Sequence, residues 1–311
     1  MVQGKNLKKY FNTPGGLLHA VDGVDVSISE GKTIGVVGES GCGKSTLGRV
    51  LIRLLEATSG EVFFEGENIL KFSPQKMLEM RKTMQIIFQD PYSSLNPRMS
   101  VSEIIAEPVK VCKILKNKND INDRINELMK IVGLSERYIN MYPHELDGGR
   151  RQRIGIARAL AVNPKFIVCD EPVSALDVSI QAQILNLMMD LQDEFKLAYM
   201  FITHSLSVVR HISNDIMVMY LGECVELAPS LTLFENPLHP YTKALLEAIP
   251  VPSMEQRTKT RKIIKGEVTS PINPKPGCRF AVRCPYVKKE CAEPVPVKEI
   301  GENHFVKCVL Y

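Results

Sequence analysis

Hydrophobic and polar residues follow two different periods along this chain. Short apolar runs rich in β-branched and aromatic residues occupy Thr33–Val37, Met84–Phe88, Phe166–Asp170 and Ala198–Thr203, as is typical of buried strands. Between these runs, apolar residues recur every three or four positions, which predicts amphipathic helices. Strands that alternate with helices indicate an α/β fold with a mainly parallel sheet covered on both faces.

The helical period is clearest in three segments. After the first strand, one helix face carries Leu47, Val50, Leu51, Leu54 and Leu55. A second apolar stripe consists of Ile125, Leu128, Met129 and Val132, and the following Gly133 would end that helix. A third, long helix should begin near Gly148 and continue through RRQRIGIARALAV.

An antiparallel part accompanies these elements. The segment GEVFFEG alternates like a strand between Gly60 and Gly66. The segment DIMVMYLGECVELA predicts a hairpin that turns near Gly222.

The composition shifts after about Glu235, where Pro, Lys and Cys become frequent and only YTKALLEAI keeps a helical pattern. We therefore expect a core domain at residues 1–235, with an irregular helical subdomain at about 91–150. Residues 236–311 would form a small, Cys-rich C-terminal extension.

The composition excludes several classes of protein. The 311 residues are 44% hydrophobic and 24% charged, as in soluble globular proteins. No apolar run approaches the roughly 20 residues that span a bilayer, and the first residues, MVQGKNLKKYF, lack the apolar core of a signal peptide. We therefore expect a cytosolic chain with reduced thiols. The net charge of 39 − 35 = +4 is too small to indicate nucleic-acid binding, and the basic cluster Arg257–Lys265 is interpreted as a solvated linker.

A phosphate-binding motif follows the first strand. GESGCGKS matches the pattern G-x-x-x-x-G-K-[ST] between a strand and a helix. The glycines let backbone N–H groups turn toward a phosphate at the helix N-terminus; Lys44 would reach the β- and γ-phosphates of ATP, and the Ser45 hydroxyl would bind Mg²⁺. The alternative is a glycine-rich turn without a ligand. The expected ATP-binding residues here are Gly38, Glu39, Ser40, Gly41, Cys42, Gly43, Lys44, Ser45 and Thr46.

An acidic pair follows the strand FIVCD. Asp170 ends this strand and is placed to hold Mg²⁺, and Glu171 comes next, where a carboxylate can deprotonate an attacking water. The alternative is an ordinary strand end with acidic residues.

Further motifs resemble those of the ATP-binding subunits of ABC transporters, over about residues 1–250. LDGGRRQRIGIARAL is similar to the family signature, IIFQD to the Q-loop, SALD to the D-loop and FITHS to the switch-histidine segment. The resemblance implies a P-loop NTPase fold in which two such domains close over two ATP molecules. Each ATP would lie between the phosphate loop of one subunit and the signature of the other.

The resemblance also implies roles for single residues. Gln89 would contact Mg²⁺ and the γ-phosphate, and His204 would position the water that Glu171 activates. An aromatic residue near the N-terminus usually stacks on adenine, and Tyr10 is the candidate, with Phe11 second. The residues expected at the signature and dimer site are Asp147, Gly148, Gly149, Arg150 and Asp177.

Three positions depart from the family pattern. Asp147 stands where the family has Ser, Arg150 replaces the usual Gln, and Ser205 replaces the Asp that often follows the switch histidine. An ionised Asp147 has no proton to donate to a phosphate, although it caps a helix as well as Ser does. Hence two hypotheses remain open: an active ATPase, or a regulatory nucleotide-binding module with impaired ATP-driven closure.

Longer segments narrow the family. FQDPYSSLNPRM, YPHEL, DEPVSALDVSIQAQILNL and NPLHPYTKALLEAIPVP resemble the subunits that power import of di- and oligopeptides in prokaryotes, most closely the F-type subunit. This implies a peripheral protein on the cytoplasmic face of the membrane, with a second ATPase subunit (a heterodimer or a homodimer), two permease subunits, an extracytoplasmic peptide-binding protein and no nucleic acid. Related importers carry nickel, haem or sugars. A non-transport ABC ATPase is the other alternative, but the 56 residues between Gln89 and Leu146 contain no heptads.

Half of the eight cysteines lie near the chain end, at Cys278, Cys284, Cys291 and Cys308. In a reducing cytosol, four such thiols suggest a structural metal centre. Family likeness favours a [4Fe–4S] cluster, which takes four thiolates. Zn²⁺ is the alternative, although its usual C-x₂₋₄-C pairs are missing, and free thiols or disulfides remain open as well.

Overall fold

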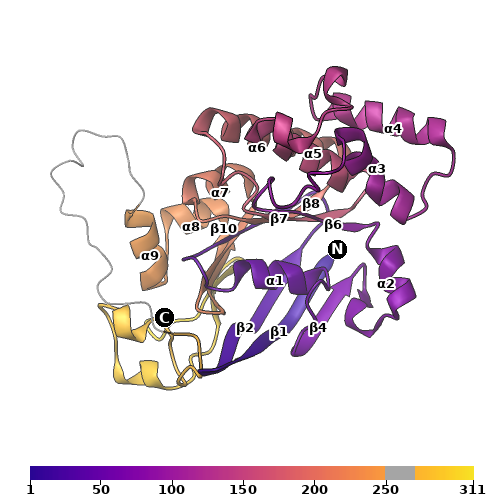
Figure 1. Cartoon of the computed structure of the whole chain (residues 1–311). Helices are drawn as coiled ribbons and strands as arrows, with labels where there is room; N and C mark the ends of the chain where they lie inside the picture. The colour runs from indigo at the N-terminus through magenta and orange to yellow at the C-terminus, as the bar shows by residue number, and fades with distance from the viewer. Residues whose placement is uncertain (249–269) are drawn as a thin grey trace, which may run out of the picture. The chain divides into compact units, whose positions relative to one another are not determined.

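The computed structural model describes residues 1–248 and 270–311 (Figure 1). The predicted linker Arg257–Lys265 lies outside the described residues. The chain divides into two compact units. The first unit consists of Met1–Val2, Ile28–Thr33 and Phe63–Ile202, and the second of Gln3–Ser27, Ile34–Val62 and Thr203–Tyr311.

Three parallel strands form the centre of the first unit. β7 (Phe166–Asp170) lies between β6 (Met84–Ile87) and β8 (Ala198–Ile202), with Ile87 opposite Cys169 and Asp170 opposite Ile202. Every residue of β7 and β8 is buried, as expected for apolar strands covered on both faces. Since parallel strands end at the same edge, the residues after β6, β7 and β8 come together there.

Helices pack on one another beside these strands (Figure 1). α3 (Val101–Val111) contacts α4 (Lys118–Ile131) and α5 (Gly148–Leu160), and α5 also contacts α6 (Val178–Phe195). A capping box of Ser100 and Glu103 begins α3. The predicted stripe of α4 is buried, and α4 ends just before Gly133, whose φ is 68°.

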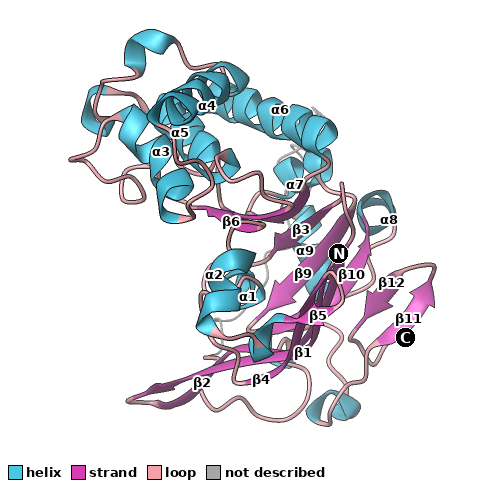
Figure 2. Cartoon of the chain, turned by 90° about the vertical axis from the view of Figure 1, so that its right-hand side faces the viewer, coloured by secondary structure: helices cyan, strands magenta, loops and turns pink. Residues whose placement is uncertain are grey.

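The second unit contains a mixed set of strands (Figure 2). β3 (Thr33–Val37) pairs in parallel with β9 (Asp215–Tyr220), and β9 pairs antiparallel with β10 (Glu223–Pro229). The turn between β9 and β10 contains Gly222, as predicted. β10 then pairs antiparallel with β12 (His304–Val306), which pairs with β11 (Lys298–Gly301). Hence the chain end extends this set of strands.

The N-terminal strands belong to the same unit. β1 (Val2–Thr13) lies between β2 (Gly16–Ile28) and β4 (Ser59–Phe64). The C-terminal segment, residues 270–311, returns to β2, where Ile272 forms a bridge with Leu18 and Asn273 donates its N–H to the Leu17 carbonyl.

Short elements complete the described residues. α1 (Lys44–Leu51) follows the phosphate loop. The predicted continuation of this helix to Leu54 and Leu55 is wrong, because Arg53 adopts a φ of 51° and Leu54 is exposed. The others are β5 (Glu67–Asn68), η1 (Ile69–Lys71), α2 (Pro74–Met80), η2 (Glu136–Tyr138), η3 (Pro143–Glu145), α7 (Leu206–Ile212), α8 (Ser230–Glu235), α9 (Pro240–Glu247), η5 (Ala281–Arg283) and η6 (Lys289–Ala292).

The core of the second unit includes the C-terminal segment. Phe280 is buried against Tyr220 and Tyr241, with ring centroids 5.3 and 5.4 Å away. Near the chain end, the buried His304 ring lies 2.8 Å from the Glu226 carboxylate, which also accepts two backbone N–H groups. The C-terminal segment therefore packs into the core of its unit through its own side chains.

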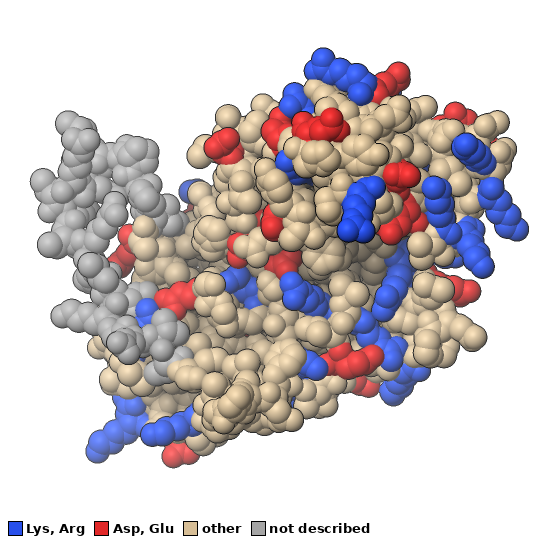
Figure 3. Space-filling view, in the orientation of Figure 1, with Lys and Arg blue, Asp and Glu red and all other residues tan. Residues whose placement is uncertain are grey.

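The surface and the helices agree with the composition. Basic and acidic side chains intermix on the face that Figure 3 shows, in keeping with the small net charge. Within residues 1–248 and 270–311, none of the helices has both the length and the apolar character that a bilayer crossing requires.

Candidate nucleotide site

The phosphate loop runs between β3 and α1 in the second unit. Gly38 and Gly43 have φ of 151° and 103°, which favour glycine. A Cβ on Gly38 would lie 2.2 Å from the Met219 carbonyl oxygen, and one on Gly43 would lie 2.0 Å from that of Ala20. Since side chains cannot fit there, these glycines are required by close backbone packing as well as by the turn.

Lys44 is held over this loop. Its side chain is buried, and Nζ donates to the carbonyls of Gly38 and Glu39, both at 2.9 Å. The same ammonium lies 3.8 Å from the Cys42 sulfur. Burial raises the pKa of the Cys42 thiol, which therefore remains protonated at neutral pH. The loop thus presents a fixed cation, and α1 begins at this lysine.

The switch histidine belongs to the second unit too. Thr203 donates its N–H to the carbonyl of Val36, at 3.2 Å, near the start of the phosphate loop. His204 follows Thr203 and is exposed. This backbone contact fixes the start of the His204 segment against the strand that leads into the loop.

Tyr10 occupies a polar cluster that the sequence did not indicate. Its ring stacks on His19 with centroids 4.0 Å apart, and its hydroxyl donates to Asp22 at 2.6 Å. Asp22 also accepts from His19, at 2.8 Å, and from Arg279 of the C-terminal segment. Burial first, and the Asp22 carboxylate second, raise the pKa of Tyr10. For Phe11, the Lys9 ammonium lies 4.9 Å from the ring centroid. Adenine stacking by Tyr10 stays a prediction.

The first unit brings three of the predicted hydrolytic residues together. Asp170 ends β7 and is buried, and Glu171 follows with a φ of 48°. Gln89, from the segment after β6, donates its amide to the Glu171 carboxylate at 3.0 Å. A non-glycine residue in this left-handed region costs about 1–3 kcal/mol and is frequent at functional sites.

The signature segment begins α5 in the first unit. Asp147 caps the helix by accepting the Arg150 N–H at 2.8 Å, and the Arg150 guanidinium pairs with the same carboxylate. Two of the three departures from the family pattern therefore form one ion pair. The Asp147 carboxylate therefore has a cationic partner within the same helix turn.

The neighbouring D-loop packs against the signature. A Cβ on Gly148 would lie 3.1 Å from Leu176, and one on Gly149 would lie 2.8 Å from Ile180. Asp177 is the N-cap position of α6. The first turn of α5 therefore depends on glycine for its approach to this segment.

The four C-terminal cysteines do not form the predicted metal centre. Cys278, Cys284, Cys291 and Cys308 line one cavity of about 10 Å³, about the size of one water molecule and therefore too small for a cluster. Across residues 1–248 and 270–311, no group of three or more His, Cys, Asp or Glu side chains is arranged to hold a metal ion. All four are free cysteines.

Burial raises the pKa of Cys278 to about 11 and also raises that of Cys284 and Cys308. Because the cavity is small and the described residues hold no group arranged for a metal ion, the expectation of an iron–sulfur cluster or a zinc ion at these four cysteines is wrong. Phe280 and its aromatic neighbours Tyr220 and Tyr241 pack this part of the chain into the core of its unit.

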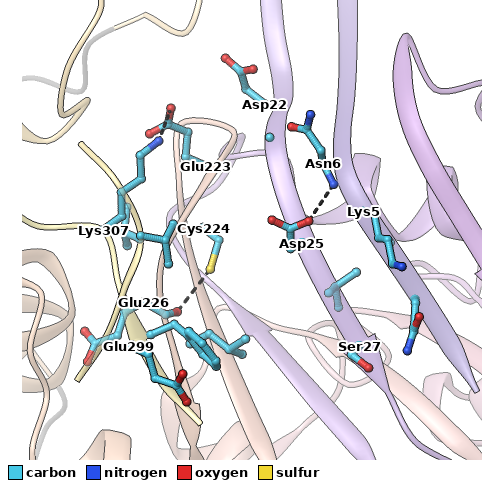
Figure 4. Close-up of a pocket in the computed structure, with 18 residues that line it drawn as sticks. Lys5, Asn6, Asp22, Asp25, Ser27, Glu223, Cys224, Glu226, Glu299 and Lys307 are labelled. Carbon is cyan, nitrogen blue, oxygen red and sulfur yellow. Dashed lines mark hydrogen bonds and ion pairs between the residues drawn. The ribbon is translucent and has the colours of Figure 1, made fainter. Parts of the chain in front are cut away.

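A larger cavity of about 820 Å³ opens in the second unit between strands β1 and β2 and strand β10 (Figure 4). Asp22, Asp25 and Glu223 are among its lining residues, and Lys307 pairs with Glu223 at 2.9 Å. None of the phosphate-loop residues lines it. The cavity is therefore not the predicted ATP site.

Comparison with known proteins identifies two family regions. Residues 21–174 match the ABC transporter family, and residues 225–291 match the C-terminal region of oligopeptide/dipeptide transporters. The oligopeptide transport ATP-binding protein AppF of Bacillus subtilis is 50% identical and covers 99% of this chain and 96% of its own. OppF of Salmonella typhimurium is 51% identical, over 98% of this chain and 92% of its own.

Solved structures confirm the fold. The dimeric ATP-binding cassette MJ0796 bound to ADP and Pi aligns with a TM-score of 0.68 at 29% identity, over 74% of this chain and 99% of that one. CbiO1 of Clostridium perfringens, part of the ABC transporter complex cbiONQ, aligns with a TM-score of 0.67 at 26% identity, over 76% of this chain and 90% of that one. The expected P-loop ATPase fold with mixed sheets is therefore confirmed, and the chain belongs to the ABC transporter family, among its oligopeptide transport ATP-binding proteins.

Proposed function

We propose that this chain binds and hydrolyses ATP to energise the import of di- or oligopeptides through an ABC transporter. Relatives that are 50% and 51% identical in sequence are named oligopeptide transport ATP-binding proteins. The observation that carries the hydrolytic role is the contact of Gln89 with Glu171 directly after the buried Asp170. We further propose that residues 1–235 are the nucleotide-binding domain and residues 236–311 the extension characteristic of these importers.

Phosphate binding would use the loop as the structure holds it. Lys44 would exchange the carbonyls of Gly38 and Glu39 for phosphate oxygens, because a charged acceptor makes a stronger hydrogen bond than a neutral one. Backbone N–H groups of the loop and of the first turn of α1 would add further donors. Tyr10 would stack on adenine.

Mg²⁺ would be held by Ser45, Gln89 and Asp170, whose oxygen atoms suit this hard cation, and when bound it neutralises phosphate charge. Ser45 lies in the first turn of α1, Asp170 is the last residue of β7, and Gln89 comes shortly after the neighbouring parallel strand β6. The donor set of hydroxyl, amide and carboxylate oxygens therefore fits the ion.

Hydrolysis needs a base beside the attacking water. Glu171 would take the proton, with its carboxylate oriented by the Gln89 amide, and His204 would contact the γ-phosphate. Glu171 also has a left-handed backbone conformation, and strained positions of this kind cluster at active sites.

The signature would complete the site of a second ATPase subunit. Asp147, Gly148, Gly149 and Arg150 would face its nucleotide, with Asp177 beside them. Because the relatives are named oligopeptide transport ATP-binding proteins, the regulatory module without turnover is not favoured. Nickel, haem and sugar are likewise not favoured as solutes.

The remaining partners follow from this assignment. The chain would work as a peripheral protein on the cytoplasmic face of the membrane, paired with a second ATPase subunit as a heterodimer or homodimer. Two permease subunits and an extracytoplasmic peptide-binding protein would complete the transporter, and no nucleic acid would take part.

Reconstitution tests the function. The chain, its paired ATPase subunit and the permeases would be placed in proteoliposomes with the binding protein, and uptake of labelled peptides and ATP turnover would be measured together. We expect ATP-dependent peptide uptake that Glu171→Gln abolishes. Robust ATP turnover with uptake of another solute but of no peptide would refute the substrate class, and absence of ATP binding would refute the whole proposal.

A further inference from the structure

The C-terminal segment contributes a buried arginine to the phosphate loop. Arg283 ends the short helix η5, and its side chain is only 7% exposed. Two guanidinium nitrogens donate to the two carboxylate oxygens of Glu39, at 2.9 and 3.0 Å. This bidentate geometry fixes both the position and the orientation of the carboxylate.

A second contact holds the backbone of the same residue. Glu39 donates its N–H to the hydroxyl of Tyr241, in α9, at 2.9 Å. Tyr241 is fully buried, and burial raises the pKa of its hydroxyl. The aromatic rings of Tyr220 and Phe280 pack around it, and the Tyr220 hydroxyl also accepts from Arg283 at 3.3 Å. Both contacts to Glu39 are thus backed by one rigid aromatic cluster.

Glu39 connects these contacts to the lysine of the loop. Its carbonyl oxygen accepts from the Lys44 ammonium at 2.9 Å. The carboxylate needs a partner when phosphate arrives, because two nearby negative charges repel one another. Arg283 supplies that partner. The loop can therefore carry an acidic residue beside its phosphate site.

Stability alone does not account for this pair. Arg283 Nε is buried, and within the described residues it has no hydrogen-bond partner. Burying an ion pair is often no more stabilising than packing apolar side chains in its place, and an unsatisfied buried donor adds a cost. The pair therefore has to be explained by what it does to the loop.

We propose that Arg283 and Tyr241 are positioning residues for the phosphate loop: they fix Glu39 and neutralise its carboxylate, so that Lys44 and the loop N–H groups are ready for nucleotide phosphates. This inference rests on the proposed binding of ATP by the loop. It assigns to the C-terminal segment a direct part in nucleotide affinity.

Calorimetric titration of the purified full chain with Mg-ATP tests the proposal. Arg283→Gln leaves the Glu39 charge unpaired, and we expect the Kd to rise about tenfold, which corresponds to about 1.4 kcal/mol. The double variant Glu39→Gln/Arg283→Gln removes both charges and should recover most of that loss. Lys289→Gln is the matched control, because it removes one positive charge from an exposed side chain of the same segment, and it should bind as the parent does.

A second variant separates positioning from folding. Tyr241→Phe keeps the ring in the aromatic cluster and removes only the acceptor for the Glu39 N–H, so we expect weaker Mg-ATP binding, by about threefold or more. Thermal unfolding without nucleotide identifies the temperature at which each variant is fully folded. In the assembled transporter, Arg283→Gln and Tyr241→Phe should each raise the KM for ATP and leave kcat largely unchanged.

The outcomes distinguish this inference from the proposed function. If the parent chain does not bind Mg-ATP, the proposed function fails with it. If the parent binds, and folded Arg283→Gln and Tyr241→Phe bind with the same Kd, the pair is structural only and the inference is wrong. Equal losses in the single and the double variant would also overturn it, because charge neutralisation predicts recovery.

Discussion

The phosphate loop and the hydrolytic carboxylates lie in different units of the chain and are supported in opposite ways. The loop residue Glu39 is held through its side chain, its N–H and its carbonyl, by groups that are largely buried. Glu171 has a strained backbone, and its carboxylate accepts from the amide of Gln89, which is exposed. The phosphate loop is thus held by buried contacts on three sides of Glu39, whereas the contact between Glu171 and Gln89 is exposed.

The largest expected effect is a loss of ATP turnover without a loss of ATP affinity, which would show that the two regions act separately. Glu171→Gln keeps the size of the side chain and its contact with Gln89 but removes the base, so we expect ATP turnover in the assembled transporter to fall about 10³-fold. The affinity for Mg-ATP, measured on the isolated chain, should stay within about twofold of the parent value. The substitution leaves the phosphate loop unchanged, and we expect the loop to provide most of the ground-state binding of ATP. A parallel loss of affinity would mean that the two regions are not separable.

The packing behind the phosphate loop should have the next largest effect. Phe280→Ala removes a fully buried ring between Tyr220 and Tyr241, and we expect the free energy of unfolding to drop by about 3 kcal/mol, as urea denaturation would measure. Exposed Tyr286→Ala, in the same segment, serves as the control and should change it by about 0.5 kcal/mol or less. If the two variants changed the free energy of unfolding by similar amounts, Phe280 would not be part of the core of its unit.

Acid should lower the free energy of unfolding through the buried His239, which lies next to this aromatic cluster. Burial lowers the pKa of His239 to about 4, whereas an unfolded histidine titrates near 6.5. Between these values the unfolded chain binds a proton that the folded chain excludes, so the stability present above pH 6.5 is lost as the pH falls toward 4. The expected slope is at most about 1.4 kcal/mol per pH unit.

The variant His239→Asn tests that slope. Asparagine keeps an acceptor for the Tyr241 N–H, which His239 now receives at 3.1 Å, but it does not titrate. The pH dependence of the free energy of unfolding between pH 6.5 and 4.5 should therefore be shallower in the variant. An unchanged slope would assign the acid sensitivity to other groups.

A smaller effect should follow from the single contact to the base. Gln89→Ala removes the amide that orients the Glu171 carboxylate, and we expect turnover to fall about tenfold, the equivalent of one hydrogen bond of about 1.4 kcal/mol. Gln89→Glu should be worse, because a second carboxylate would repel the base. Turnover equal to the parent in both variants would show that Gln89 takes no part in hydrolysis.

The smallest effect concerns the signature. Asp147→Ala removes both the helix cap and the partner of Arg150, and we expect about 1 kcal/mol less stability. Asp147→Ser keeps the cap and should recover most of that loss. If serine raised ATP turnover well above the parent rate in the assembled transporter, Asp147 would impair closure after all.

Local patterns were sufficient to predict much of the fold and part of the site. Neighbouring residues were enough to recognise the glycine pattern of the phosphate loop, the apolar strand that ends at Asp170 and the turn at Gly222, and the structure places them as expected. The close approach of the Met219 and Ala20 carbonyls to Gly38 and Gly43 could not be read from that pattern. The helix after the loop ended earlier than its apolar spacing indicated, because Arg53 leaves the helical region. Periodicity does not report such a backbone change.

Contacts between distant residues were beyond the sequence. Arg283 and Glu39 are separated by 244 positions and Arg279 and Asp22 by 257, so no spacing rule could join them. The cysteines show another limit of the sequence.

The four cysteines that cluster in the sequence do line one cavity. The number and spacing of thiols, however, do not give the size of the space between them, and that space is too small for a cluster. The boundary at residue 235 stays a prediction.

The bridge from the C-terminal segment to β2 has a consequence for handling the protein. β2 is the outermost strand of its sheet, and Leu17, Leu18 and His19 are covered by residues 271–273. A chain cut before Ser270 would lose this cover and present unpaired backbone groups to other molecules, which is a template for aggregation. Shortened versions should therefore be less soluble than the full chain, even where their phosphate loop is intact.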